Sequence, residues 1–345
     1  MADAVAKLTQ LMSWESFGDL LTSFWATLRL PDSDNSTIVY DIIVFYASSD
    51  PLIFAMRAGL VCSFIAWFQS MATGLHSWVD KIWPIVPVLY AIHFSVSDMF
   101  FWPADKPFIY VPRAYLATAL IFLWGARATY NFGRQGGYSF EYEDHRWSYM
   151  GQKMPAGIWF FFNIFFICLF QNQLLVFLTV PVYMAWRASL AMVTPLNWID
   201  LVATVGAVAG LVLENVAEHQ KWVFEQSLKK AIENKEALTG DYKRGFLTQG
   251  VWKYSRHPNF SGELVMWWSI YLYSVAAGYP EYIEWINPSI AGVAVLTILY
   301  QGAITTTENI FSAKFPAYKL YRQTTSRLIP LPAGTPLDKV EKKAL

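Results

Sequence analysis

Seven long apolar segments, separated by charged or polar residues, decide what this chain can fold into. A helix needs about 20 mostly apolar residues to cross roughly 30 Å of hydrocarbon. The segments therefore predict an all-α, polytopic membrane bundle of about seven transmembrane helices, with six to eight as the range. They cover residues 52–71, 82–101, 110–128, 158–185, 198–217, 261–277 and 288–305.

Two stretches leave the number of spans open. Residues 37–47 are too few to span alone, so they form either an eighth element or an interfacial helix. Residues 158–185 are long enough for one tilted span or a re-entrant pair, and three consecutive polar residues, Gln171, Asn172 and Gln173, interrupt them. The charges of the connecting loops favour one net crossing there.

Composition agrees with a membrane protein and excludes other classes. Hydrophobic residues make up 55% of the chain and charged residues 15%, against about 25% charged residues in soluble domains. A formal net charge of zero argues against nucleic acid as a partner. Cys62 and Cys168 each lie inside an apolar segment, which argues against a disulfide framework and against a metal cluster. No feature indicates a protein partner beyond the lipid bilayer itself.

The basic residues indicate which loops face the cytosol. Four lie within residues 127–153, eight within 221–256 and seven after residue 305, whereas residues 278–287 contain none. Basic loops stay cytosolic, so these three segments share one membrane face. The acidic segment 1–50 is then lumenal or interfacial, and Asn35 in Asn35-Ser36-Thr37 is a glycosylation sequon. Residues 51–330 form the membrane domain, and the polar residues 331–345 are predicted to be a disordered tail.

The run from Gly250 to Glu263 carries the strongest chemical signal. Pro258 suits the first turn of a helix, which places Asn259 and Glu263 on one face. Arg256 and His257 precede this helix N-terminus, a favourable site for a phosphate, although both could equally be anchors for lipid headgroups. Glu263 is harder to explain as an anchor, because a carboxylate inside a span costs about 2.5 to 3.5 kcal/mol and needs a partner or a ligand.

This run resembles the C-terminal signature of the steroid 5-alpha-reductase-like membrane oxidoreductases, most closely their uncharacterised branch (domain of unknown function 1295). The residues that carry the resemblance are Gly250, Trp252, Tyr254, Ser255, Arg256, His257, Pro258, Asn259, Gly262 and Glu263. In reductases of that superfamily this region holds NADPH. The resemblance therefore implies a cofactor site that faces the cytosol, with contacts from Tyr254, Arg256, His257, Asn259 and Glu263, in a protein of the endoplasmic reticulum.

Further matches extend the resemblance over residues 124–330. Arg127 and Asn131 lie four apart at the cytosolic end of a span, where the family has an Arg that reaches the cofactor phosphates; an ordinary basic anchor is the alternative. Glu214 and Glu218 match an acidic pattern of the family and would repel each other unless a ligand hydroxyl or Lys221 intervenes.

The tail after Glu308 also resembles the family. Tyr318 and Tyr321 lie one turn apart near its end, where they either stack on an adenine or lie at the membrane interface.

One position departs from the superfamily pattern. Steroid reductases have a Tyr that supplies a proton just before the Arg of the first matching patch, and this chain has Trp124 there. An indole N–H donates a hydrogen bond but does not titrate near neutral pH. The catalytic acid is therefore expected to be Tyr130, or Asp98 with His93.

Three functions follow as hypotheses. The first is a membrane-embedded, NADPH-dependent reductase of a carbon-carbon double bond in a lipid or steroid-like substrate. The second is an S-adenosylmethionine-dependent methyltransferase similar to the isoprenylcysteine carboxyl methyltransferases, which share the Arg-His-Pro motif but have a pair of glutamates where this chain has Glu308 and Asn309. The third is a non-catalytic lipid-binding protein. Asn259 and Glu263 favour the reductase.

Overall fold

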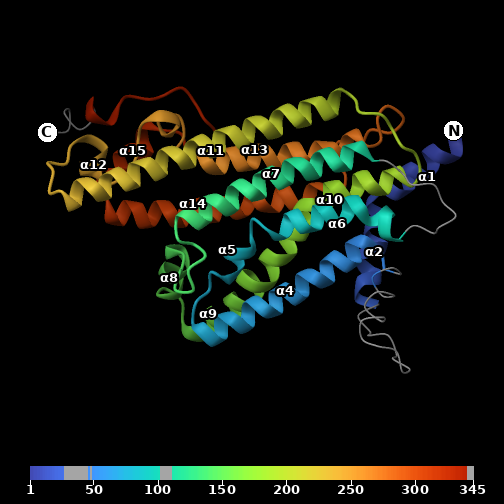
Figure 1. The fold of residues 1–345 in the computed structure, drawn as a ribbon, viewed down its shortest axis with the longest axis horizontal. Coiled ribbons are helices and arrows are strands. Elements are labelled where there is room, and N and C mark those ends of the chain that lie inside the picture. Colours follow the sequence, from blue (N-terminus) through green and yellow to red (C-terminus); the bar gives the residue numbers. More distant parts are fainter. Residues whose placement is uncertain (27–45, 47–48, 102–110, 340–345) are drawn as a thin grey trace. The chain divides into compact units, whose positions relative to one another are not determined.

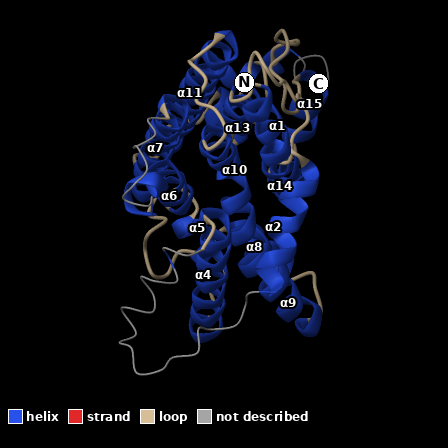
Figure 2. Ribbon diagram, turned by 90° about the vertical axis from the view of Figure 1, so that its right-hand side faces the viewer, coloured by secondary structure: helices blue, strands red, loops and turns tan. Residues whose placement is uncertain are grey.

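The computed structural model describes residues 1–26, 46, 49–101 and 111–339, and within these residues all regular structure is helical (Figures 1 and 2). The N-terminal helices, α1 and α2, precede eleven further helical segments up to residue 276. In chain order the helices are α1 (Ala2–Met12), α2 (Trp14–Ala26), α4 (Pro51–Thr73), α5 (Trp78–Ile82), α6 (Val86–Phe101), α7 (Pro112–Arg134), α8 (His145–Gly151), α9 (Ala156–Phe162), the π-helix η1 (Asn163–Phe170), α10 (Gln171–Ser189), α11 (Trp198–Glu233), α12 (Gly240–Arg244), the 3-10 helix η2 (Gly250–Lys253), α13 (Pro258–Ala276), α14 (Ile290–Lys314) and α15 (Tyr318–Thr324).

Each of the seven apolar segments is helical, so the all-α prediction is confirmed for the described residues. Four helices are long and apolar enough to cross a membrane: Pro51–Thr73, Ala156–Ser189, Trp198–Glu233 and Ile290–Lys314. A shorter apolar stretch covers Val86–Ser97. The chain is thus an integral, polytopic membrane protein. The stretch 37–47 and the sequon at Asn35 lie outside the described residues, apart from the single helical residue Tyr46.

The long segment that includes residues 158–185 is one uninterrupted helix of 34 residues rather than a re-entrant pair. Its middle part, η1, has π-helical geometry, and α10 continues through the polar residues 171–173 without a break. The amides of these residues are buried in the bundle, which is why they do not end the helix.

Capping residues explain where several helices begin. Asp50 precedes α4, and its Oδ1 accepts a hydrogen bond from the Leu52 N–H at 2.8 Å. Asp144 caps α8 in the same way through the Arg146 N–H at 2.8 Å. Pro258 starts α13, as the sequence predicts, because a proline loses no hydrogen bond in the first turn.

The described helices form two compact units. The first comprises Met1–Val205 and Trp268–Val295, and the second comprises Gly206–Trp267 and Leu296–Leu345. The long helices α11, α13 and α14 each contribute to both units.

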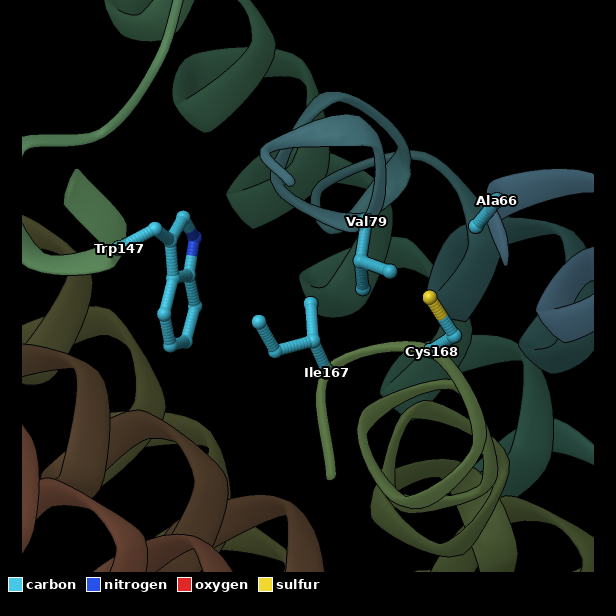
Figure 3. Packing of buried hydrophobic residues seen from close by; sticks show 5 residues of the cluster. All are labelled: Ala66, Val79, Trp147, Ile167 and Cys168. Atoms are coloured by element: carbon cyan, nitrogen blue, oxygen red, sulfur yellow. The ribbon is translucent and has the colours of Figure 1, made fainter. Parts of the chain in front are cut away.

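In the first unit, α10 packs against α1, α4, α6 and α7. A hydrophobic cluster of this unit joins Ala66 of α4, Val79 of α5 and Trp147 of α8 to Ile167 and Cys168 of η1 (Figure 3). Cys168 is 2% exposed, and Val79 and Ile167 point toward each other across this cluster. The loops and the π-helix are therefore fixed by one shared core.

Beside this cluster lies a group of acidic residues with opposite protonation behaviour. Asp80 Oδ2 accepts a hydrogen bond from Trp147 Nε1 at 2.9 Å. Burial, with a smaller contribution from the Asp144 carboxylate, raises the pKa of Asp80 to about 6. Burial also acts upward on Asp144, but the Arg146 guanidinium, 2.8 Å away, outweighs it and lowers the pKa of Asp144 to about 2.

A pH dependence of stability follows from Asp80. Its pKa is higher in the folded state than its ordinary value of 3.8, so the folded state loses stability as the pH rises from about 4 to about 6. The Asp80→Asn variant removes this titration and keeps an acceptor for Trp147. Its melting temperature relative to wild type should rise between pH 4 and pH 7. The exposed Glu141→Gln variant is the control, and a difference independent of pH would contradict the assignment.

Close packing in the second unit depends on two glycines where α11 crosses α13. A Cβ on Gly210 would lie 2.5 Å from the Gly262 carbonyl oxygen, and one on Gly262 would lie 2.6 Å from the Glu214 nitrogen. No side chain fits at either position, so the two helix backbones touch there. This contact sets the level at which the polar residues of both helices meet.

Candidate functional site

The candidate site lies in the second unit, around the N-terminus of α13. The residues that lead into this helix are tied to the segment after α15, which we call the C-terminal strap (residues 326–331). The Arg256 N–H donates to the Ser326 carbonyl at 2.8 Å, and Ser255 Oγ donates to the Leu328 carbonyl at 2.8 Å. The Leu331 N–H donates to the Tyr254 carbonyl at 3.1 Å. The strap therefore covers the entry to α13.

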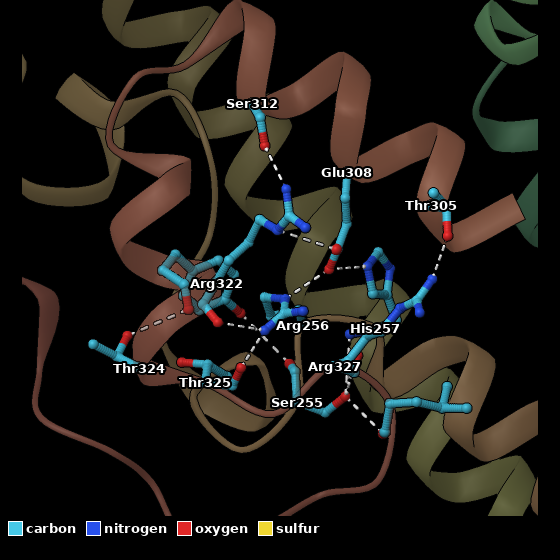
Figure 4. Close-up of polar contacts among 12 residues, drawn as sticks. Ser255, Arg256, His257, Thr305, Glu308, Ser312, Arg322, Thr324, Thr325 and Arg327 are labelled. Carbon is cyan, nitrogen blue, oxygen red and sulfur yellow. Dashed lines mark hydrogen bonds and ion pairs between the residues drawn. The ribbon is translucent and has the colours of Figure 1, made fainter. Parts of the chain in front are cut away.

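A single carboxylate on α14, Glu308, gathers the cations of this region (Figure 4). Its Oε1 lies 2.6 Å from Arg256 Nε and 3.3 Å from His257 Nε2, and its Oε2 lies 3.3 Å from Arg322 Nε. The side chains of Glu308, Arg256 and His257 are 3%, 8% and 6% exposed, whereas that of Arg322 is 43% exposed. Two arginines and a histidine thus share one carboxylate.

Arg256 is committed to contacts within the chain. Besides Glu308, its Nη1 donates to the Arg322 carbonyl at 2.9 Å and to the Thr325 carbonyl. Burial lowers the pKa of His257, although the hydrogen bond to Glu308 acts in the opposite direction. Both residues, which the sequence assigns to the cofactor, join α13 to α14 and to the strap. Direct contact of either with a nucleotide stays a prediction.

Three polar side chains follow along the helices from this point. Glu214 of α11 and Glu263 of α13 are 3% and 9% exposed, and Gly262 brings the two helices together at their level. Asn259, in the first turn of α13, has a buried Oδ1 atom with no hydrogen-bond partner among the described residues. Glu218, one turn after Glu214, is half-buried. The structure therefore brings Glu214, Asn259 and Glu263 to one end of the α11–α13 pair.

The two tyrosines of the tail are not available for stacking on a nucleotide base. Tyr318 and Tyr321 are 4% and 2% exposed and pack with Phe246 and Leu337. The Tyr321 hydroxyl donates to the Trp252 carbonyl. Neither alternative from the sequence applies, because an internal aromatic cluster buries both rings. Leu337 is also part of the segment expected to be disordered, of which residues 331–339 are described. Tyr254, by contrast, is 39% exposed.

The other predicted residues belong to the first unit. Arg127, Tyr130 and Asn131 lie on α7; Asn131 is 8% exposed and accepts from Arg134 Nε at 2.8 Å, and Tyr130 is 68% exposed. The side chain of Asp98 lies outside the described residues. Its proposed companion His93 accepts or donates a hydrogen bond at Nδ1 with the Tyr46 hydroxyl at 2.7 Å.

Sequence reasoning assigned no role in the site to Glu308 or to the strap. The available signal was a carboxylate three residues beyond an apolar segment, the same signal that identified Glu263. Its partners are more than fifty residues away for Arg256 and fourteen residues away for Arg322, so spacing alone did not connect them.

Comparison with known proteins places this arrangement in a family. The family described as "Protein of unknown function (DUF1295)" matches residues 66–325, which include every candidate residue of the second unit. An uncharacterized protein of Schizosaccharomyces pombe is 30% identical over 307 residues, which cover 87% of this chain and 86% of that protein. No solved structure matches. The chain belongs to the DUF1295 family.

Proposed function

We propose that the protein is a membrane-embedded, NADPH-dependent reductase of a carbon-carbon double bond in a lipid or steroid-like substrate. It would belong to the steroid 5-alpha-reductase-like superfamily and cross the endoplasmic reticulum membrane seven times, with its cofactor site toward the cytosol. The observation that carries the proposal is the pair of buried carboxylates, Glu214 and Glu263, beside the N-terminus of α13. A protein that served only as a scaffold would be more stable with apolar residues at these places.

The residues present fit a phosphorylated nucleotide. The cations around Glu308 outnumber it, because Arg256 and Arg322 share this one carboxylate. The half-exposed Arg322 guanidinium is accessible to an anion, and the N-terminus of α13 favours one as well. The Asn259 Oδ1 atom needs a donor, which a ribose hydroxyl or a carboxamide N–H supplies.

Division of labour follows from these positions. NADPH, when bound, supplies hydride to the β carbon of the substrate's activated double bond. Asn259, Glu214 and Glu263 orient the nucleotide through hydrogen bonds, with Glu218 and Tyr254 at the more exposed edge. Arg256, His257 and Glu308 hold the strap over the helix entry and exclude water. Arg127 and Asn131 would add phosphate contacts, and Tyr130 or Asp98 would protonate the α carbon.

A ligand panel tests the class of function. The melting temperature of the detergent-purified protein would be measured with NADPH, NADP, NADH and S-adenosylmethionine, since a ligand at 100 times its dissociation constant adds about 2.7 kcal/mol to the folded state. Stabilisation by NADPH, with less or none by NADH, is the expected result. Stabilisation by S-adenosylmethionine alone would replace the proposal with the methyltransferase, and no stabilisation by any of the four would favour a lipid-binding protein.

Replacing Asn259 tests the position of the site. Asn259→Ala removes a buried oxygen that has no partner in the ligand-free chain, so its stability without ligand should match wild type within about 0.5 kcal/mol. Its affinity for NADPH should fall about tenfold, the effect of about 1.4 kcal/mol. Asn215→Ala, on the exposed face of α11, is the control. Equal affinity in both variants would exclude Asn259 from the site.

A further inference from the structure

Three helices of the first unit enclose polar side chains in an otherwise apolar interior. α10 packs against α4 and α6, and at their contact Tyr90, Gln171 and Asn172 are 6%, 3% and 0% exposed. Inside a bundle that is surrounded by lipid, a buried polar group lowers stability unless its hydrogen bonds are satisfied. None of these residues belongs to the candidate cofactor site.

The side chain of Gln173 fixes the position of this group on α4. Its Nε2 atom donates to the Met56 carbonyl at 3.2 Å and lies 2.8 Å from the Cβ position of Gly59. Cys62 is three residues after Gly59, and so lies one helical turn of α4 away from Gln173. The Tyr90 hydroxyl of α6 lies beside the Cys62 sulfur. The three helices therefore present these groups within about one turn of one another.

Three hydrogen-bonding atoms of this cluster are left unmatched. The Asn172 amide nitrogen donates to the Cys168 carbonyl at 2.7 Å, but its Oδ1 is buried without a partner among the described residues. The same holds for Gln173 Oε1 and for the Tyr90 hydroxyl, whose sulfur neighbour is only a weak hydrogen-bonding group. Each such atom costs about 1 to 3 kcal/mol when it is left unsatisfied.

An alcohol is the chemical complement of these atoms. Its O–H donates to an amide oxygen, and its oxygen accepts from the Tyr90 hydroxyl. The neighbours of Cys62 and Tyr90 along their helices, Val61 and Leu89, are 59% and 57% exposed. These exposed apolar side chains face outward from the bundle, so a lipid reaches the cluster from the membrane. We propose that Tyr90, Asn172 and Gln173 form a binding site for the hydroxyl group of a lipid alcohol.

Binding requires a small rearrangement, for which the surroundings are suited. The three atoms are enclosed in the structure, so side chains must move aside to admit a ligand. Gly59 offers no side chain of its own at this contact. The π-helix η1, which ends directly before Gln171, has a hydrogen-bonding pattern that occurs mostly at functional sites. The proposal needs no cofactor and is independent of the reductase function.

Cys62 provides a reporter for the test. In the Cys168→Ala variant Cys62 is the remaining thiol, and its rate of reaction with N-ethylmaleimide would be measured in nanodiscs with farnesol or with farnesyl methyl ether. Farnesol should slow the reaction about tenfold more than the ether, a ratio that corresponds to about 1.4 kcal/mol. In Tyr90→Phe and in Asn172→Leu the two compounds should differ by less than about twofold, since each variant removes one partner of the hydroxyl.

Three results would overturn the proposal. Equal protection by farnesol and the ether would indicate apolar partitioning alone. An advantage of farnesol that persists in both variants would show that other groups, or only ordered water at this cluster, account for it. No difference between the compounds in the melting temperature of the wild-type protein, measured without the reagent, would exclude binding directly. Gln173→Met serves in place of Asn172→Leu if the latter does not fold.

Discussion

The Glu308→Ala variant is expected to lose about 3 to 5 kcal/mol of unfolding free energy, because it leaves the guanidinium of Arg256 buried without its carboxylate. The Arg256 side chain is 8% exposed, so water cannot replace the lost oxygen without disrupting the packing. The C-terminal strap, which depends on Arg256 and its neighbours, should become sensitive to protease. Melting temperature and limited proteolysis of the purified protein measure the two effects.

A matched pair of variants separates charge from packing at this position. Glu308→Gln keeps an oxygen that accepts from Arg256 and should lose less stability than Glu308→Ala. Asn309→Ala, on the exposed face of the same helix, should behave as wild type. If Glu308→Ala unfolds at the same temperature as Asn309→Ala, the ion pair does not support this part of the fold.

In the first unit, Arg113→Ala should be destabilising by a similar amount, about 3 to 5 kcal/mol. Arg113 forms a two-point ion pair with Asp200, at 2.7 and 2.8 Å, and both side chains are almost fully buried. Its remaining N–H groups donate to Thr194 Oγ1 and to the Pro195 carbonyl, each at 2.9 Å. The loss is expected as a lower melting temperature of the purified protein.

The double variant provides the more discriminating measurement. Asp200→Ala alone leaves Arg113 as a buried unpaired cation, whereas Arg113→Met with Asp200→Leu removes both charges and restores apolar contacts. The double variant should therefore be more stable than either single alanine variant. The exposed Lys153→Ala is the control. Losses that add up in the double variant would show that the two residues act separately.

The positions of the helices were predictable because one physical requirement, the burial of apolar segments in lipid, acts on each segment separately. The start of α13 at Pro258 was predictable for a local reason as well, since proline has no N–H to lose in the first turn. The continuous helix through residues 171–173 was harder to foresee. Its polar amides suggest a break until their burial against α4 is known.

The candidate site was predictable only as a set of residues. Glu214, Asn259 and Glu263 were found because polar groups in apolar helices need a reason to be there. The partners of Arg256 depend on how α14 and the strap fold back onto α13, and neither helical spacing nor composition contains that information. Tyr318 and Tyr321 illustrate the same limit, since the partner that buries them, Phe246, lies some seventy residues earlier.

The 34-residue helix formed by α9, η1 and α10 is about 50 Å long at 1.5 Å per residue, whereas the hydrocarbon layer is about 30 Å thick. Such a helix must tilt or extend beyond the hydrocarbon, and the balance between these responses changes with bilayer thickness. Asn172 and Gln173 lie on this same helix, pressed against the 23-residue α4. Hydrophobic mismatch therefore acts on the helix that carries the buried amides, and membranes of different thickness should load their contact with α4 differently.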